Sequence, residues 1–157
     1  MGLDMYINQC NRTEHTIEQL NDINNTDDLN PEMVQATPFL PLHEYTHFTA
    51  YSIFHEAAYW RKANAIHAWF VRNVQNNEDD CGYYELTQEH LQNLVQVCNK
   101  VLETQDATLL PPQGGFFFGS TDVDDWYWAD VKRTIEQVSN ILNKDWSKHR
   151  FFYHSSW

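Results

Sequence analysis

The stretch from Ala58 to Phe70, A-Y-W-R-K-A-N-A-I-H-A-W-F, decides how this sequence is expected to fold. Its spacing predicts one helix over about Ala58–Val74, because apolar residues recur every three or four positions. One stripe of that helix is expected to be buried; it comprises Tyr59, Ala63, Ile66, Phe70 and Val74. The next stripe carries polar groups that a plain core would not need; it comprises Trp60, Asn64, His67 and Val71. We therefore expect a core face and a site face.

The flanking segments predict both strands and helices. Leu3, Met5 and Ile7 alternate with more polar residues, which is typical of a strand with one buried face. Further strands are expected at 83–86, 116–118 and 150–154, and 45–54 also favours a strand. Thr87 is a plausible N-cap for a strongly amphipathic helix, and Thr121 with Asp124 resembles a capping box before the last helix. This order predicts a single α+β domain over residues 1–157, with about three substantial helices on a small mixed sheet.

Composition excludes some functions. The 157 residues suit one domain, and 42% hydrophobic residues suit a packed core. The net charge of −12 argues against direct binding to nucleic acid and fits either a partner protein with a basic surface or solubility alone. No apolar run is long enough for a membrane span. The three widely spaced cysteines lack a C-x-x-C pair and fit a reducing cytoplasm. No cofactor is expected.

Arg61 and Lys62 are the sharpest indication of a binding site. In the first turn of the predicted helix they would oppose the helix dipole, which prefers acidic groups. Such a placement indicates a partner, either a bound anion or an internal carboxylate such as Asp79 or Asp80. His67 would titrate near neutrality or donate a hydrogen bond within the core. A structural ion-pair cluster beside a core histidine therefore remains the alternative.

A second candidate anion site follows the aromatic run. Gly119-Ser120-Thr121-Asp122 is expected at a strand-to-helix junction, where backbone N–H groups and hydroxyls can hold an anion. Helix capping alone would also explain these residues. The predicted ligand-binding set is Trp60, Arg61, Asn64, His67, Ser120 and Thr121. The acidic run Glu78, Asp79 and Asp80 is the predicted partner-binding surface.

The segment His43-Glu44-Tyr45-Thr46-His47 fits the H-E-x-x-H pattern of zinc hydrolases. On a helix the two histidines would bind zinc and Glu44 would activate water, with Glu56 as a further ligand. The preceding prolines and the β-branched residues that follow favour a strand instead, which argues against that helix. Zinc hydrolysis is therefore the alternative function, and the metal site is tied to His43, His47 and Glu56.

Five blocks resemble a family of uncharacterised small proteins of tailed phages, prophages and bacteria. They are Gly2-Leu3-Asp4-Met5-Tyr6, Tyr59-Trp60-Arg61-Lys62 with Asn64, His67 and Trp69-Phe70, then Asp79-Asp80-Cys81, Phe116–Thr121 and Tyr153–Trp157. The likeness is weakest over 11–54, which is expected to be a variable, insertion-like region. The resemblance implies a phage or mobile-element origin and a place in the host cytoplasm, and it brings no established activity.

These observations predict an accessory binding protein of phage type. It is expected to inhibit a host or anti-phage defence component, either by binding a protein or by sequestering a small anionic molecule. A protein that acts only by assembling with itself is a further possibility, and the oligomeric state is left open. The sequence thus predicts a site and a mode of action without naming the ligand.

Overall fold

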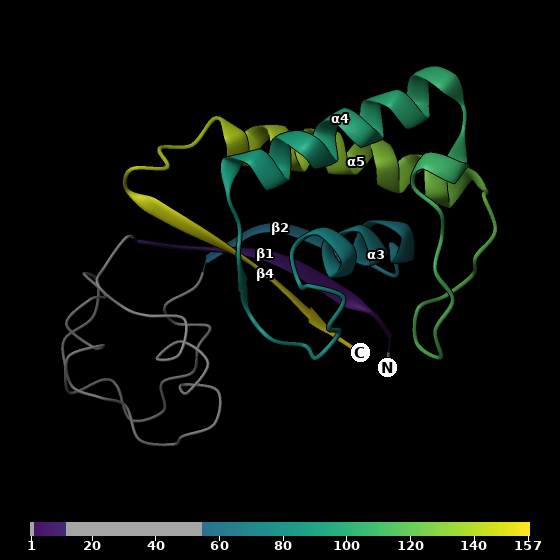
Figure 1. The fold of residues 1–157 in the computed structure, drawn as a ribbon, viewed down its shortest axis with the longest axis horizontal. Coiled ribbons are helices and arrows are strands. Elements are labelled where there is room, and N and C mark those ends of the chain that lie inside the picture. Colours follow the sequence, from purple (N-terminus) through teal and green to yellow (C-terminus); the bar gives the residue numbers. More distant parts are fainter. Residues whose placement is uncertain (1, 12–54) are drawn as a thin grey trace.

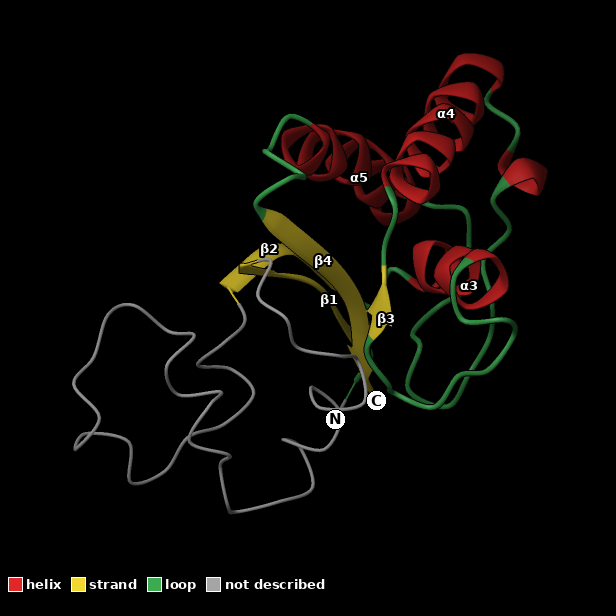
Figure 2. Cartoon of the chain, turned by 60° about the vertical axis from the view of Figure 1, so that its left-hand side comes forward, coloured by secondary structure: helices red, strands yellow, loops and turns green. Residues whose placement is uncertain are grey.

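The backbone forms one four-stranded sheet with its helices on one side (Figures 1 and 2). The computed structural model describes residues 2–11 and 55–157, and every statement below concerns those residues. The strands are β1 (Asp4–Asn11), β2 (His55–Arg61), β3 (Tyr84–Glu85) and β4 (His149–Ser156). The helices are α3 (Asn64–Asn73), α4 (Gln88–Thr104) and α5 (Asp125–Leu142), with a 3-10 turn, η3 (Ala107–Leu109). The predicted α+β class is confirmed.

The sheet is antiparallel throughout, so the predicted mixed sheet is wrong. Its strand order is β2-β1-β4-β3, and each neighbouring pair runs antiparallel. Two parallel strands need a crossover connection, which returns the chain to the end of the sheet at which the first strand began. Here the chain passes through α4 and α5 and returns to the end of the sheet at which β3 ended (Figure 2). The last strand, β4, therefore runs back alongside β3 in the opposite direction.

The first strand has the predicted alternation. Leu3, Met5 and Ile7 are completely buried. Met5 lies opposite Trp60 of β2 and Ser155 of β4 in the sheet register, so these three side chains share the face beneath the helices. The core therefore lies between this face and the helix layer, where apolar area is removed from water. The predicted strands at 83–86 and 150–154 correspond to β3 and β4.

The predicted helix over 58–74 is wrong at its beginning. Ala58, Tyr59, Trp60 and Arg61 belong to β2, and the helix starts only at Asn64. Lys62 separates the two elements: its φ of 59° is left-handed, a conformation that a helix cannot contain. The N–H of Lys62 donates to the carbonyl of Leu3 at 2.7 Å, which extends the pairing with the N-terminal segment. The predicted burial of Ile66 and Phe70 is confirmed in α3.

The start of α4 is as predicted. The hydroxyl of Thr87 accepts a hydrogen bond from the His90 N–H, and the Thr87 N–H donates to Nδ1 of His90. These reciprocal bonds form a capping box, with histidine in the position usually taken by Glu or Gln. The predicted stripe is buried at Leu91, Leu94, Cys98 and Val101. This local capping signal was sufficient to locate the helix.

The segment before α5 differs from its prediction. Residues 116–118 form a turn, closed by the Phe118 N–H donating to the Gly115 carbonyl at 3.1 Å. Phe118 is buried, but the Phe116 side chain is 95% exposed, so no buried strand is present there. The N-cap of α5 is Asp124, whose Oδ1 accepts from the N–H groups of Trp126 and Tyr127. The predicted cap at Thr121 is therefore wrong.

Within the described part of the chain, no helix combines the length and the apolar character needed to cross a membrane.

Candidate functional site

A cavity of about 420 Å³ lies between the end of β2, the start of α3 and the first half of α5. This volume falls in the range of about 300–1,000 Å³ typical of small-molecule sites. Its lining includes the charged side chains of three different segments; they are Arg61, Lys62, Asp122, Asp124, Asp130 and Arg133. Trp126 and Tyr127 add aromatic groups, and Pro112, Gly119 and Ser120 come from the loop before α5.

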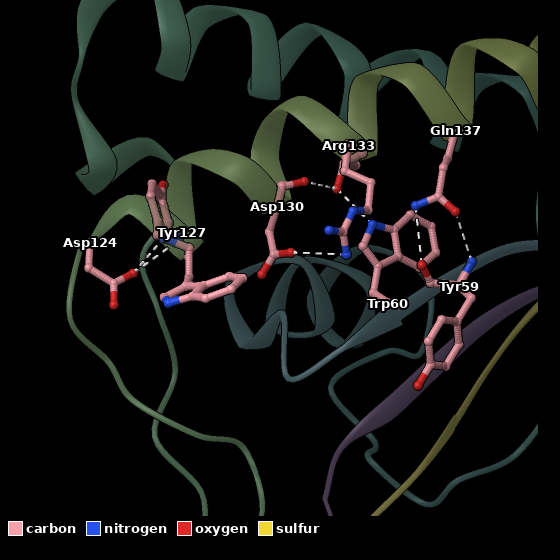
Figure 3. Close-up of polar contacts among 9 residues, drawn as sticks. Tyr59, Trp60, Asp124, Tyr127, Asp130, Arg133 and Gln137 are labelled. Carbon is pink, nitrogen blue, oxygen red and sulfur yellow. Dashed lines mark hydrogen bonds and ion pairs between the residues drawn. The ribbon is translucent and has the colours of Figure 1, made fainter.

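The α5 wall of the cavity is fixed to the edge of the sheet. The side-chain amide of Gln137 accepts from the N–H of Tyr59 at 2.9 Å and donates to its carbonyl at 3.2 Å. These bonds satisfy backbone groups on the outer edge of β2, where no further strand of the described residues pairs. The indole N–H of Trp60 donates to the Thr134 hydroxyl at 2.9 Å (Figure 3). The wall is thus held to β2 by three hydrogen bonds.

The loop wall is fixed by Asn64, the first residue of α3. Its amide nitrogen donates to the carbonyls of Phe118 at 3.1 Å and Ser120 at 2.7 Å. Its amide oxygen accepts from the Gln113 N–H at 3.2 Å. Gly119 has a φ of 86° in the left-handed range, and a Cβ there would lie 3.4 Å from Cβ of Lys62. Glycine therefore permits both the turn and the close packing against Lys62.

The β2–α3 side of the cavity is positive. The Arg61 side chain is 58% exposed, and its Nη1 lies 3.6 Å from Oδ1 of Asp4, a pair too exposed to hold the guanidinium firmly. Arg61 thus has an internal carboxylate partner, as one alternative expected, but that partner is Asp4 and not Asp79 or Asp80. Lys62 has no ion pair among residues 2–11 and 55–157.

The first turn of α3 adds donors to this positive side. Its N-cap residue, Ala63, makes no side-chain cap, and the first turn contains no acidic residue. The N–H groups of Ala65 and Ile66 have no hydrogen-bond acceptor in the described structure, and both residues line the cavity. Helix N–H groups point toward the N-terminus and carry partial positive charge there. Unsatisfied donors therefore accompany the two cationic side chains.

The α5 side of the cavity is mainly negative. Asp124, Asp130 and Arg133 project from the surface of α5 that faces β2 and α3 (Figure 3). Asp130 Oδ1 lies 3.8 Å from Nη1 of Arg133, which is an ion-pair distance and longer than a hydrogen bond. Burial raises the pKa of the Asp130 carboxyl, against the opposing effect of Arg133 and with a contribution from Asp124. These carboxylates keep acceptor capacity for a ligand.

His67 lies apart from the cavity and has a structural environment. Its side chain is fully buried, with Nε2 3.0 Å from Oδ2 of Asp79 and Nδ1 2.7 Å from the Tyr153 hydroxyl. Burial lowers the pKa of His67, and the Asp79 hydrogen bond opposes this only in part. The contact therefore joins a neutral imidazole to a carboxylate. Because Asp79 can only accept, Nε2 carries the proton and Nδ1 accepts from Tyr153.

The acidic run is only partly directed to solvent. Asp79 also accepts from the indole N–H of Trp157 at 3.1 Å, and Asp80 accepts from the Gly82 N–H at 2.9 Å. Burial, followed by a hydrogen bond to Asp80, raises the pKa of Tyr84 to about 12. Two of the three predicted partner-binding carboxylates thus have internal bonds, while Glu78 is exposed. Partner binding by this run stays a prediction.

No group of three His, Cys, Asp or Glu side chains able to hold a metal occurs among the described residues. His43, Glu44 and His47 of the H-E-x-x-H motif lie outside those residues, as does the segment 45–54, for which a strand is expected. Glu56 is exposed in β2, where it lies opposite Asn8 in the register. The zinc interpretation therefore stays a prediction.

The structure brings together some of the predicted ligand-binding residues. Arg61, Asn64 and Ser120 line the cavity, whereas Trp60, His67 and Thr121 do not. Trp60 is buried beneath α5, and Thr121 is exposed. Three of the residues of α5 that line the cavity were not singled out from the sequence; these are Trp126, Asp130 and Arg133. What could have indicated them is their position on the helix, because each lies next in sequence to one of the buried residues Tyr127, Val131 and Thr134.

Comparison with protein-family models, curated proteins and solved structures finds no match to this chain.

Proposed function

We propose that this protein binds a small anionic molecule in the cavity between β2, α3 and α5. It would act as a phage-type accessory protein in the host cytoplasm, and it would inhibit a host or defence component by sequestering that molecule. The convergence of Arg61, Lys62 and the uncapped first turn of α3 on one cavity supports the ligand. The resemblance of the five sequence blocks to small phage proteins supports the biological setting.

The lining of this cavity is less negative than the chain as a whole, which favours an anion there over the rest of the surface. The whole chain carries a net charge of −12, which repels anions at long range. The cavity lining instead balances three cations against three carboxylates, with both Arg61 and Lys62 on one side. Charge-assisted hydrogen bonds at short range would therefore hold the anion. Added salt should weaken binding less than it does for a basic protein, because it also screens the repulsion.

Sequestration fits the state of the cysteine side chains. Burial raises the pKa of the Cys10 thiol to about 11 and that of the Cys98 thiol to about 12. Both thiols are thus protonated at neutral pH and inert as nucleophiles. The zinc-hydrolase alternative depends on His43, Glu44 and His47, and metal analysis of the purified full chain tests it separately.

Titration calorimetry of the full chain with inorganic pyrophosphate tests the proposal. We expect saturable binding to one site, weakened about tenfold in Arg61→Gln and in Lys62→Gln, since each removes one charge-assisted contact. The matched control is Lys100→Gln, which makes the same change of charge on α4, away from the cavity. Absence of pyrophosphate binding, or equal affinity in all three variants, would overturn the anion site.

A further inference from the structure

The cavity has two chemically different ends. The β2–α3 end offers cations and backbone N–H groups, through Arg61, Lys62 and the first turn of α3. The α5 end offers carboxylate oxygens, through Asp124 and Asp130. A simple anion satisfies only the first end and gives no hydrogen bond to Oδ2 of Asp124 or to the Asp130 carboxylate, whose partner in the described residues is the ion pair with Arg133. The ligand that matches both ends must combine an anionic group with hydrogen-bond donors.

The carboxylates of α5 keep free acceptor atoms. Asp124 uses Oδ1 to cap the helix, by accepting from the N–H groups of Trp126 and Tyr127. Its Oδ2 has no hydrogen-bond donor in the described structure. The Asp130 carboxylate accepts no hydrogen bond there either, because Arg133 stands 3.8 Å away. Asp124 is exposed, whereas the Asp130 side chain is only 20% exposed, and a partly buried acceptor without a hydrogen-bond donor favours a donor-bearing ligand.

Trp126 provides a flat apolar surface on the lining of the same cavity. It is 76% exposed although tryptophan is usually buried in large part. The residue belongs to the first turn of α5, two positions after the capping Asp124. An exposed indole beside a polar cavity is the arrangement on which planar bases stack, since every base has a π-face. The α5 end therefore combines a stacking surface with acceptors.

We infer that the ligand is a nucleotide, with its phosphates against Arg61, Lys62 and the start of α3 and its base against Trp126. Amino or hydroxyl donors of the base and ribose then face Asp124 and Asp130. A nucleotide is the class of small molecule that unites an anionic group, a planar ring and several donors. This inference rests on the proposed function, because it assigns the anionic group to the same cation end.

The test compares four probes on the full chain by titration calorimetry: ADP, GDP, adenosine and inorganic pyrophosphate. We expect ADP or GDP to bind at least about tenfold more tightly than pyrophosphate. Adenosine, which lacks phosphate, should bind more weakly than ADP. Trp126→Ala and Asp130→Asn should weaken binding of that nucleotide about fivefold to tenfold, whereas neither should weaken pyrophosphate binding, because neither side chain donates to the anion. Phe116→Ala and Asp125→Asn are the matched controls, because neither residue lines the cavity.

The outcomes separate the two proposals. Pyrophosphate binding that depends on Arg61, together with no gain in affinity for ADP or GDP, would overturn the nucleotide inference and leave the anion site standing. Nucleotide binding that Trp126→Ala and Asp130→Asn do not alter would also overturn it. If none of the four probes binds, both proposals fail.

Discussion

The imidazole of His67 donates from Nε2 to the Asp79 carboxylate across 3.0 Å. Its Nδ1 lies 2.7 Å from the buried Tyr153 hydroxyl, so the three side chains form a hydrogen-bonded series. The contact with Asp79 joins α3 to the loop before β3, and Asp79 extends it to the indole of Trp157. Asp79 therefore connects the middle of the chain to its last residue. A buried polar chain of this kind stabilises the fold only while every member keeps its partner.

Replacing Asp79 should destabilise the protein. In Asp79→Ala the Nε2–H of the fully buried His67 loses its acceptor, and an unsatisfied buried donor costs about 1–3 kcal/mol. Urea unfolding followed by circular dichroism measures the change. Glu78→Ala is the control, since the adjacent side chain is exposed, and it should change stability by less than about 0.5 kcal/mol. Equal effects of the two substitutions would contradict the assigned contact.

Stability should fall on acidification because of His67. Burial depresses the pKa of His67 in the fold below its ordinary value of 6.5, so the unfolded chain binds more protons as pH falls through that value. The stabilising contribution is thus complete above about pH 6.5 and is lost as pH falls through the folded pKa. His154, whose pKa burial also lowers, acts in the same direction.

Urea unfolding of wild type at pH 7.5, 6.5 and 5.5 measures this dependence. In His67→Gln the decline between pH 7.5 and 5.5 should be smaller than in wild type, because one group no longer titrates. His55→Gln, which changes an exposed histidine of β2, is the control and should keep the wild-type decline. An unchanged decline in His67→Gln would refute the neutral state assigned to this imidazole.

The two candidate caps of α5 can be told apart by mutation. Asp124→Ala removes the side-chain acceptor of two backbone N–H groups and should cost about 0.5–2 kcal/mol of unfolding free energy. Thr121→Ala should be nearly neutral, because its exposed side chain caps no helix in the structure. Chemical denaturation of both variants provides the comparison. A larger loss in Thr121→Ala would place the cap at Thr121 after all.

Gly119 is required by its backbone conformation. At a φ of 86° a Cβ is strained, and an L-residue in a left-handed conformation costs about 1–2 kcal/mol. Gly119→Ala should therefore lower stability by about that amount. Gly114→Ala in the same loop is the matched control, since its Cβ would meet only the Thr121 side chain at an ordinary 3.7 Å. Thermal unfolding of the pair tests this, and similar melting temperatures would contradict it.

Elements with a single local pattern could be predicted from the sequence. Thr87 and the stripe that begins at Leu91 predict α4 without help from distant residues, and the alternation around Met5 predicts β1. The boundary between β2 and α3 could not be found in this way. The residues from Ala58 to Arg61 fit both the alternation of a strand and the helical spacing of the residues that follow. The left-handed Lys62, bonded to the distant Leu3 carbonyl, decides between them.

The candidate site was predictable only where its residues stand out in the sequence. Asn64 interrupts an apolar stripe, Arg61 would oppose a helix dipole, and Ser120 lies in an expected strand-to-helix junction; all three line the cavity. Asp130 and Arg133 look in sequence like ordinary solvent positions of an amphipathic helix. Only the docking of α5 on the edge of β2 directs them into the cavity, and that docking depends on Gln137, far along the chain from Tyr59.

The pairing of β1 with β4 sets the order of events during protein synthesis. These two strands are the centre of the sheet, and β1 meets its C-terminal partner along its whole length, from Asp4 opposite Ser156 to Asn11 opposite His149. A ribosome adds about 5–20 residues per second, so β1 waits on the order of ten seconds or more for residues 149–156 to be made. The centre of the sheet therefore forms late in synthesis, and the buried side chains of Leu3, Met5 and Ile7 lack the neighbouring strand β4 until then.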